Sequence, residues 1–154
     1  MGLAIGVTIS GDARTIDILR GAKTVLEDFT NVFEQLGLWL VGYYGGEAFK
    51  SQGGVYAIPW PRLAPATQAY KIKHYRQYTT VPLMATGTMS RSFIYKATSR
   101  TLTIGNTAPY FMYHQSTAPR TKIPWRPMML INTPIKDTIK AVITDDINAK
   151  ISTL

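Results

Sequence analysis

The stretch AKTVLEDFTNVFEQLGLWLVGYYGGEAF (residues 22–49) decides the fold, because its apolar residues recur at every third or fourth position. This spacing places them along one face of an α-helix. The longest apolar run within it, LGLWLVGYY (residues 36–44), has nine residues, about half of what a membrane-spanning helix requires. The pattern predicts one long amphipathic helix, from Ala22 to about Phe49, that packs on a protein core.

Two further segments predict β-structure. The apolar, β-branched run LAIGVTI (residues 3–9) favours a strand, and Asp12 can cap a short helix over residues 13–20 that is broken near Gly21. Residues 92–98 and 101–105, SFIYKAT and TLTIG, are separated by a two-residue turn and predict a β-hairpin. A loop over residues 52–65, a short helix at residues 66–77, and a turn or a short helix within residues 83–92 are also expected.

The C-terminal part predicts a strand and a helix. Residues 127–131 follow a proline-rich bend and indicate a strand. Thr133 can cap a final helix with Pro134 at its first position. This helix carries one apolar stripe: Ile135, Ile139, Val142, Ile143, Ile147 and Ile151. The predicted fold class is α+β, with a small antiparallel β-sheet packed by one long helix in the N-terminal half and by a C-terminal helix, in a single domain spanning residues 1–154.

Composition indicates a globular chain with its own core. Of 154 residues, 45% are hydrophobic and 17% charged, far from the signature of disorder. Cysteine is absent, which excludes disulfides, thiolate metal sites and cysteine nucleophiles. The opening residues lack the basic segment of a secretory signal, so none is expected.

Charge is distributed unevenly along the chain. The net charge is +8, yet no Asp or Glu occurs from Ala48 to Lys136, where twelve Lys and Arg stand. The middle of the chain is therefore predicted to present a basic surface between mildly acidic flanks. Such a surface suits a polyanion such as nucleic acid, and it equally suits subunits that stack a basic face on an acidic one.

No pattern for catalysis, metal or cofactor binding was found. His74 and His114 are separated by a stretch without acids, so a carboxylate partner for either could come only from the flanking helices, and no nucleophile elbow occurs. GYYGG (residues 42–46) and QGG (residues 52–54) lack the residues of a phosphate-binding loop and are interpreted as backbone turns at the end of the long helix. We expect no enzyme activity, no metal and no cofactor.

The segment YKIKHYRQY (residues 70–78) interleaves aromatic and basic residues, a composition typical of nucleic-acid stacking surfaces. The alternative is that its aromatic residues tether a solvated basic loop to the core. Both interpretations are open at this point.

The segment YFMYHQSTAPRTKIPWRPMM (residues 110–129) combines aromatic residues with three prolines and no acid. Prolines fix φ and remove backbone donors, so this bend is predicted to be stiff and poor at edge pairing. Trp125 and Arg126 are residue types that dominate interface hot spots. The alternative is that Trp125 covers the core and Arg126 makes an internal hydrogen bond. We interpret the segment as a rigid docking edge.

Six segments stand in a recognisable order: FKSQGG (49–54), WPRLAPATQAYK (60–71), LMATGTMSRSF (83–93), LTIGN (102–106), PYFMYHQ (109–115) and IPWRPMM (123–129). Together they resemble the bacteriophage virion morphogenesis, or tail completion, family, which comprises small head–tail joining proteins of tailed phages. The resemblance covers about residues 49–129, and the flanking helices match by pattern only.

The resemblance implies a structural virion protein, tail-terminator-like, that forms a homo-oligomeric ring, commonly a hexamer, at the head-proximal tail end or in the neck. Its partners would be copies of itself, tail-tube and neck or connector proteins, and phage DNA in the lumen, without a membrane. It would be located in the virion, and in the host cytoplasm during assembly. The alternative function is a stand-alone basic nucleic-acid-binding module.

Two groups of residues are predicted to make these contacts. The subunit or neighbour-ring interface is assigned to Tyr110, Tyr113, His114, Gln115, Ile123, Pro124, Trp125, Arg126 and Pro127. Contacts with DNA in the lumen or with an acidic partner are assigned to Lys71, Lys73, Arg76, Arg91, Lys96 and Arg100.

Overall fold

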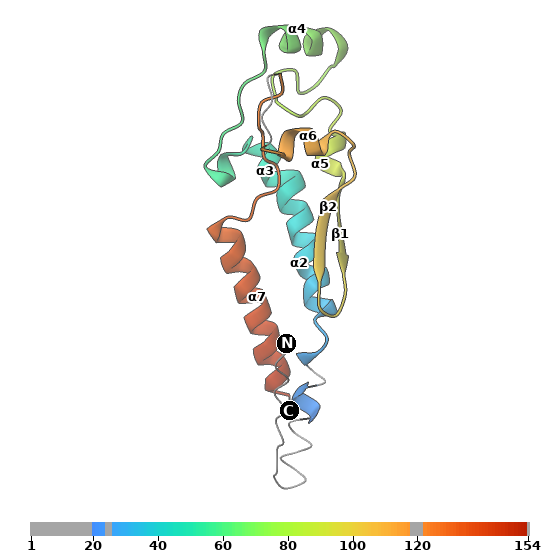
Figure 1. Cartoon of the computed structure of the whole chain (residues 1–154), viewed down its shortest axis with the longest axis vertical. Coiled ribbons are helices and arrows are strands. Elements are labelled where there is room, and N and C mark those ends of the chain that lie inside the picture. The colour runs from blue at the N-terminus through green and yellow to red at the C-terminus, as the bar shows by residue number, and fades with distance from the viewer. Residues whose placement is uncertain (1–19, 24–25, 118–121, 154) are drawn as a thin grey trace, which may run out of the picture.

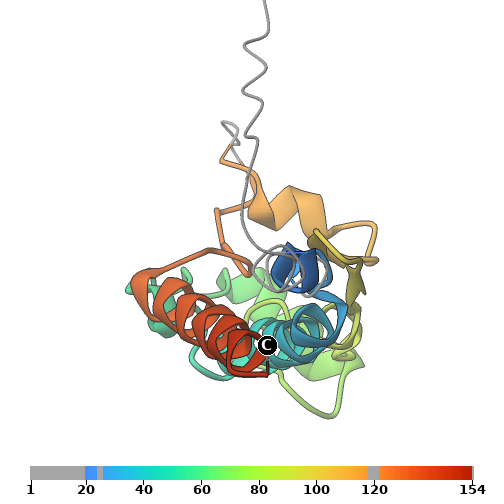
Figure 2. The same cartoon turned by 90° about the horizontal axis from the view of Figure 1, so that it is seen from below.

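The computed structural model describes residues 20–23, 26–117 and 122–153. The molecule is elongated: helix α2 forms its axis, a β-hairpin and helix α7 flank it, and the short helices gather at one end (Figure 1). Viewed along the axis, α7 and the hairpin lie on opposite sides of α2 (Figure 2). The predicted α+β class is confirmed. The strand predicted over residues 3–9 lies outside the described residues, as does all but Arg20 of the helix predicted over residues 13–20.

The long predicted helix is present, but it begins later than expected. Helix α2 spans Thr30–Gly42 and continues through a π-helix, η1 (Tyr43–Glu47), into α3 (Ala48–Lys50). The predicted helix is interrupted just before Thr30: residues 20–23 and Leu26 are helical, whereas Asp28 and Phe29 are not. At this break the carboxylate of Asp28 accepts a hydrogen bond from the Thr30 backbone N–H at 2.8 Å. The Phe29 N–H meanwhile donates to the carbonyl of Ser99 in the hairpin turn, at 3.0 Å.

The π-helix keeps one apolar face of this helix in line. Buried residues recur at four-residue spacing, from Val32 through Leu36, Leu40 and Tyr44 to Ala48. Each step of four advances about 40° around an α-helix, so the stripe would drift away from the core. In η1 the Ala48 N–H bonds to the Tyr43 carbonyl, five residues back, and this wider turn reverses part of the drift.

The two glycine-containing segments near the end of this helix adopt different structures. The GYYGG segment was predicted to be a turn after the helix, and this is wrong, because η1 carries the helix on to Lys50. The QGG segment does form a turn, with Gly53 in the left-handed region at φ +83°. A short 3₁₀ helix, η2 (Gly54–Tyr56), follows it.

The predicted hairpin is confirmed. Strands β1 (Phe93–Ala97) and β2 (Leu102–Asn106) pair antiparallel, with Phe93 opposite Asn106 and Ala97 opposite Leu102. One face of the hairpin packs on α2, where Gly37 leaves room for the ring of Tyr95. The Tyr95 hydroxyl donates to the carboxylate of Glu34 at 2.6 Å, which ties the sheet to the helix.

The C-terminal helix α7 spans Thr133–Ile151. Its cap is Asn132, one residue before the predicted Thr133, and the Asn132 side chain accepts from the Ile135 N–H at 3.1 Å. Ile135 is buried, whereas Ile151 is exposed. The apolar stripe of α7 is therefore in the core only at its beginning.

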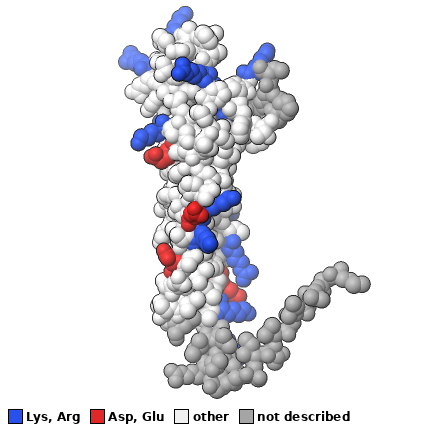
Figure 3. Space-filling view, turned by 90° about the vertical axis from the view of Figure 1, so that its left-hand side faces the viewer, with Lys and Arg blue, Asp and Glu red and all other residues white. Residues whose placement is uncertain are grey.

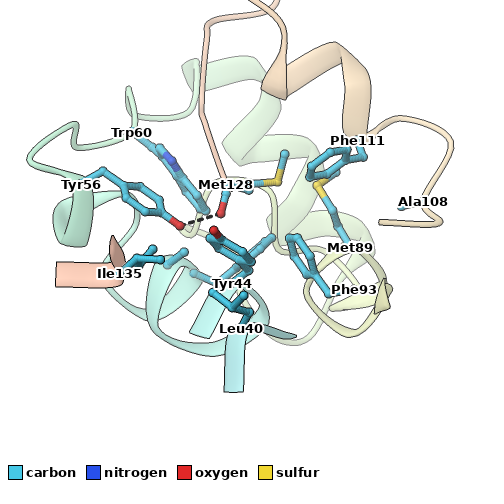
Figure 4. Close-up of a cluster of buried hydrophobic side chains, with 12 residues drawn as sticks. Leu40, Tyr44, Tyr56, Trp60, Met89, Phe93, Ala108, Phe111, Met128 and Ile135 are labelled. Atoms are coloured by element: carbon cyan, nitrogen blue, oxygen red, sulfur yellow. Dashed lines mark hydrogen bonds between the residues drawn. The ribbon is translucent and has the colours of Figure 1, made fainter. Parts of the chain in front are cut away.

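The strand predicted over residues 127–131 is wrong, because this segment makes no β-ladder. It crosses the core in an irregular path, with Met128 among the aromatic residues of helices and loops (Figure 4). The core cluster also includes Tyr56, Trp60, Phe93 and Phe111. The segment between α3 and α4 (Pro65–His74), which includes η2, thus contributes two large aromatic side chains, Tyr56 and Trp60, to the core.

Three short helices complete the upper end of the molecule in Figure 1: α4 (Pro65–His74), α5 (Thr88–Arg91) and α6 (Phe111–Gln115). Helix α4 ends three residues before the predicted Gln77, because Tyr75 adopts extended backbone angles. Within the described ranges, no helix has the length and apolar character needed to cross a bilayer.

Replacing Gly45 by Ala is expected to lower the free energy of unfolding by about 1–3 kcal/mol, since the new Cβ would collide with the Ser90 backbone carbonyl. Gly46→Ala in the same π-helix is the control, because nothing lies within 4 Å of its Cβ position. Urea unfolding of both variants measures the difference. Equal midpoints would contradict close packing of η1 on α5.

Candidate docking surface and its buried support

Residues 126–129 cross the core as an irregular segment, and side chains from distant elements bond its backbone. The Tyr56 hydroxyl donates to the carbonyl of Met128 at 2.8 Å. The Trp60 indole N–H donates to the carbonyl of Pro127, also at 2.8 Å. These bonds replace a β-ladder, because a buried carbonyl without a donor is costly.

Gln115 clamps the same segment to α6. Its Oε1 accepts from the N–H groups of Met128 (2.9 Å) and Met129 (3.0 Å), and its Nε2 donates to the Met129 carbonyl at 2.7 Å. Gln115 was predicted to contact a neighbouring subunit. Its amide makes these three bonds within its own chain, and the contact with a neighbouring subunit stays a prediction.

Arg126 was also predicted to contact a neighbouring subunit, but its side chain is buried in its own chain. Only 6% of it is exposed, and its guanidinium donates from Nε (3.0 Å) and Nη2 (2.9 Å) to the carbonyl of Pro61, and from Nη2 to that of Arg62 at 3.2 Å. Burial lowers its pKa from the ordinary value. The internal hydrogen bond, the alternative interpretation of Arg126, is the one observed. Pro127 is fully buried as well and cannot contact a partner.

Lys71 was predicted to contact DNA or an acidic partner, and it too is buried, with 6% exposed. Its ammonium donates to the carbonyls of Val81 (2.6 Å) and Met84 (2.5 Å). Burial, and then the charge of Arg126, lower its pKa. Lys71 therefore fastens the 75–84 loop to α4.

What remains outside is an apolar surface on and beside α6. Met112 is 70% exposed and Tyr113 54% exposed. The Trp125 indole N–H donates to the Gln115 carbonyl at 3.1 Å and the Arg126 N–H to the His114 carbonyl at 3.1 Å, so residues 122–126 are held against α6. We call this the α6 surface: Tyr110, Met112, Tyr113, Ile123 and Trp125.

The two remaining predicted interface residues lie beside this surface. Pro124 is exposed and His114 is half-buried. His114 lines a small cavity of about 230 Å³ together with Lys71, Tyr110 and Arg126. Among the described residues that line it there is no Asp or Glu.

The other predicted basic contacts are exposed but spread along the molecule. Lys73 and Arg76 lie at the α4 end, whereas Lys96 and Arg100 are on the hairpin and its turn. Arg100 lies 3.7 Å from Glu27, and Arg91 donates to the Thr86 carbonyl at 2.7 Å. On the face shown in Figure 3, the end formed by α4 displays only basic side chains, and acids join the bases further down. The structure does not gather these residues into one stripe.

Among the described residues, no group of three or more His, Cys, Asp or Glu could hold a metal ion. The chain was compared with protein-family models, curated proteins and solved structures, and none of them matches.

Lys71→Met is expected to cost about 1–3 kcal/mol of stability, because it leaves the Val81 and Met84 carbonyls without a donor. Lys73→Met, two residues away and exposed, is expected to change stability by less than about 0.5 kcal/mol. Thermal or urea unfolding compares them. Equal stability of the two variants would contradict this anchoring role of the Lys71 ammonium.

Stability is expected to fall as the pH rises above 10. Burial raises the pKa of Tyr44 to about 12 and that of Tyr56 further, while an unfolded tyrosine ionises near 10. Above pH 10 the unfolded state therefore binds fewer protons than the folded state, and the free energy of unfolding decreases.

Tyr56→Phe tests this contribution. At pH 7 it should cost about 1 kcal/mol, because the hydrogen bond to the Met128 carbonyl is lost. This deficit should shrink as the pH is raised above 10, since Phe cannot ionise. Tyr110→Phe, at an exposed position, is the control. A deficit that stays constant to pH 12 would contradict the raised pKa of Tyr56.

Proposed function

We propose that this chain is a structural virion protein of a tailed bacteriophage, which forms a ring, hexameric by the resemblance, at the head-proximal end of the tail or in the neck. There it would complete the tail and join it to the head around the DNA. The observation that carries the proposal is the α6 surface. It is an exposed aromatic and methionine cluster on a rigid buried support, with the composition of an interface core.

The support of this surface favours the same proposal. The resembling segments 109–115 and 123–129 meet in space, since Gln115 of the first bonds the backbone of the second. Segment 60–71 joins them, through the Trp60 indole and the Pro61 carbonyl. Three of the segments that resemble the family are thus bonded to one another, as expected if their role is to hold the α6 surface in place.

Ring formation requires that the α6 surface of one copy meet a different surface on the next, with a rotation that closes. The basic end at α4 would face either the DNA in the lumen or an acidic neighbouring ring. Non-specific contact with DNA needs only exposed cations near phosphates. Lys73 and Arg76 meet that requirement, and buried Lys71 does not.

The stand-alone nucleic-acid-binding module remains the second candidate. One observation favours it: Tyr70 and Ile72 of α4 are 57% and 60% exposed beside Lys73 and Arg76. Such a module should bind single-stranded or duplex DNA with an affinity that falls steeply with salt, and a Lys73/Arg76 double Gln variant should reduce that slope. No binding at moderate salt would remove this candidate.

Met112→Glu is expected to abolish assembly while leaving the fold intact, because Met112 is exposed in the monomer and a carboxylate would be buried at the interface. Leu38→Glu, at an exposed position on α2, is the matched control. Light scattering after gel filtration and complementation of phage growth would compare the two. Normal assembly and infectivity of Met112→Glu would contradict docking through α6.

The role itself is tested by electron microscopy of lysates from phage with a nonsense codon at the start of this gene. Full heads beside unattached tails, in particular tails of abnormal length, are expected. Normally joined particles would contradict the proposal and leave the basic end at α4 as the leading functional feature.

A further inference from the structure

The cavity beside His114, about 230 Å³ in volume, has two buried cations in its wall, Lys71 of α4 and Arg126. Each of these two residues is only 6% exposed. Buried charges in proteins are normally paired with a charge of opposite sign. No Asp or Glu stands among the described residues of the wall, and none occurs in the sequence from Ala48 to Lys136. An anion that pairs with these two cations would have to come from outside this part of the chain.

Both cations keep donors that the chain does not use. Arg126 donates from Nε and Nη2 to backbone carbonyls, and Lys71 donates to the carbonyls of Val81 and Met84. A guanidinium has five N–H donors and an ammonium has three. Nη1 of Arg126 and the third N–H of Lys71 therefore donate to none of the described residues, and both belong to side chains that line the cavity.

The two positive charges also act on each other. Burial lowers the pKa of Lys71, and the charge of Arg126 lowers it further. Carbonyl oxygens carry only partial charges, so their hydrogen bonds do not cancel this repulsion. An anion in the cavity would be attracted by both cations at a site shielded from water, where the attraction is stronger than in bulk solvent.

The rest of the wall indicates which anion fits. Leu63, Leu83 and Met89 give it apolar surface, whereas Thr67 and Tyr110 are exposed and mark its opening. A phosphate presents oxygens on every side and would leave some of them against the apolar wall without donors. A carboxylate has both oxygens at one end, so the hydrocarbon stem behind it can pack on apolar side chains.

We propose that this cavity binds a carboxylate group on a short hydrocarbon stem, with its oxygens on Nη1 of Arg126 and Nζ of Lys71. Arginine and lysine both make strong, charge-assisted hydrogen bonds to carboxylates. The group comes from a small organic acid in solution or from an acidic side chain of a docked protein, which present the same chemistry. The inference holds whether or not the α6 surface forms a ring, so it does not rest on the proposed virion role.

Titration of the full-length chain with sodium propionate, at an ionic strength held constant with sodium chloride, tests the site. Propionate carries the carboxylate and an ethyl stem. NMR signals of the Arg126 side-chain N–H groups and of the Met89 methyl group report on the cavity, because both side chains line it. Both signals should shift and saturate with the same Kd, whereas sodium phosphate should give no saturable shift. The methyl group of Met112, which is exposed and does not line the cavity, is the internal control.

A carboxylate built into the wall should compete with the ligand. Thr67 is exposed and lies one helical turn before Lys71, so Thr67→Glu places a carboxylate at the cavity without changing the core. It should weaken propionate binding about tenfold or more, since the internal carboxylate occupies the site for most of the time. Gln68→Glu is the matched control, because it adds the same charge in the same turn while Gln68 lines a different hollow. It should leave the Kd for propionate unchanged.

Gel filtration with light scattering distinguishes the two sources of the carboxylate. Dissociation of an assembly of the chain by saturating propionate would assign the site to an acidic side chain of a neighbouring copy. A mass that does not change with propionate, together with saturable binding, would assign it to a free organic acid.

Three results would overturn the proposal. The first is a set of shifts that stay linear up to the highest propionate concentration, which would mean that no site exists. The second is equally tight binding of phosphate, which would mean a general anion site in place of a carboxylate site. The third is equal propionate binding by Thr67→Glu and Gln68→Glu, which would place the ligand elsewhere on the molecule.

Discussion

The backbone N–H and C=O groups of the proline-rich segment 124–129 need hydrogen-bond partners inside the core. The rest of the structure is arranged around that constraint. Prolines at positions 124 and 127 prevent a regular ladder, yet Met128 is entirely buried. The carbonyls of this segment therefore need donors from elsewhere, and Tyr56 and Trp60 supply them across more than sixty residues of sequence. These bonds connect the loop after α3, helix α6 and the start of α7 into one unit.

The charge distribution leads to a second property of the same region. No acid occurs between Ala48 and Lys136, so a cation buried there has no carboxylate from its own segment. Arg126 and Lys71 use peptide carbonyls in its place. Carbonyl dipoles compensate a buried charge only in part, which is why the pKa of each is lowered. The two most deeply placed cations consequently serve the fold and the cavity that they line, and exposed cations such as Lys73 are the ones left for a polyanion.

Sequence reasoning succeeded where structure is local. The periodicity around Leu36, the alternation on either side of Ser99 and the capped stripe beginning at Ile135 each record a helix or strand in neighbouring residues, and all three elements are present.

Sequence reasoning failed where the residues that determine the structure are far apart in the chain. Residues 127–131 have the composition of a strand, but the partners of their backbone are Tyr56, Trp60 and Gln115, which no local pattern reveals. Burial of Arg126 and Lys71 was equally hidden, although the absence of nearby acids was a signal that buried cations here would bind carbonyls. Of the α6 surface, Tyr110, Tyr113, Ile123 and Trp125 are among the residues predicted to face a partner, whereas its most exposed residue, Met112, is not.

The π-helix at Tyr43–Glu47 has a consequence for how this protein can change in length. A π-turn holds one residue more than the α-turn it replaces, and nothing lies within 4 Å of a Cβ added at Gly46 within it. Losing one residue there would restore an α-turn while the helical segments before and after it keep their faces toward the core. The central helix can therefore absorb a single-codon deletion at this turn, and alignments of diverging descendants should show their length variation there.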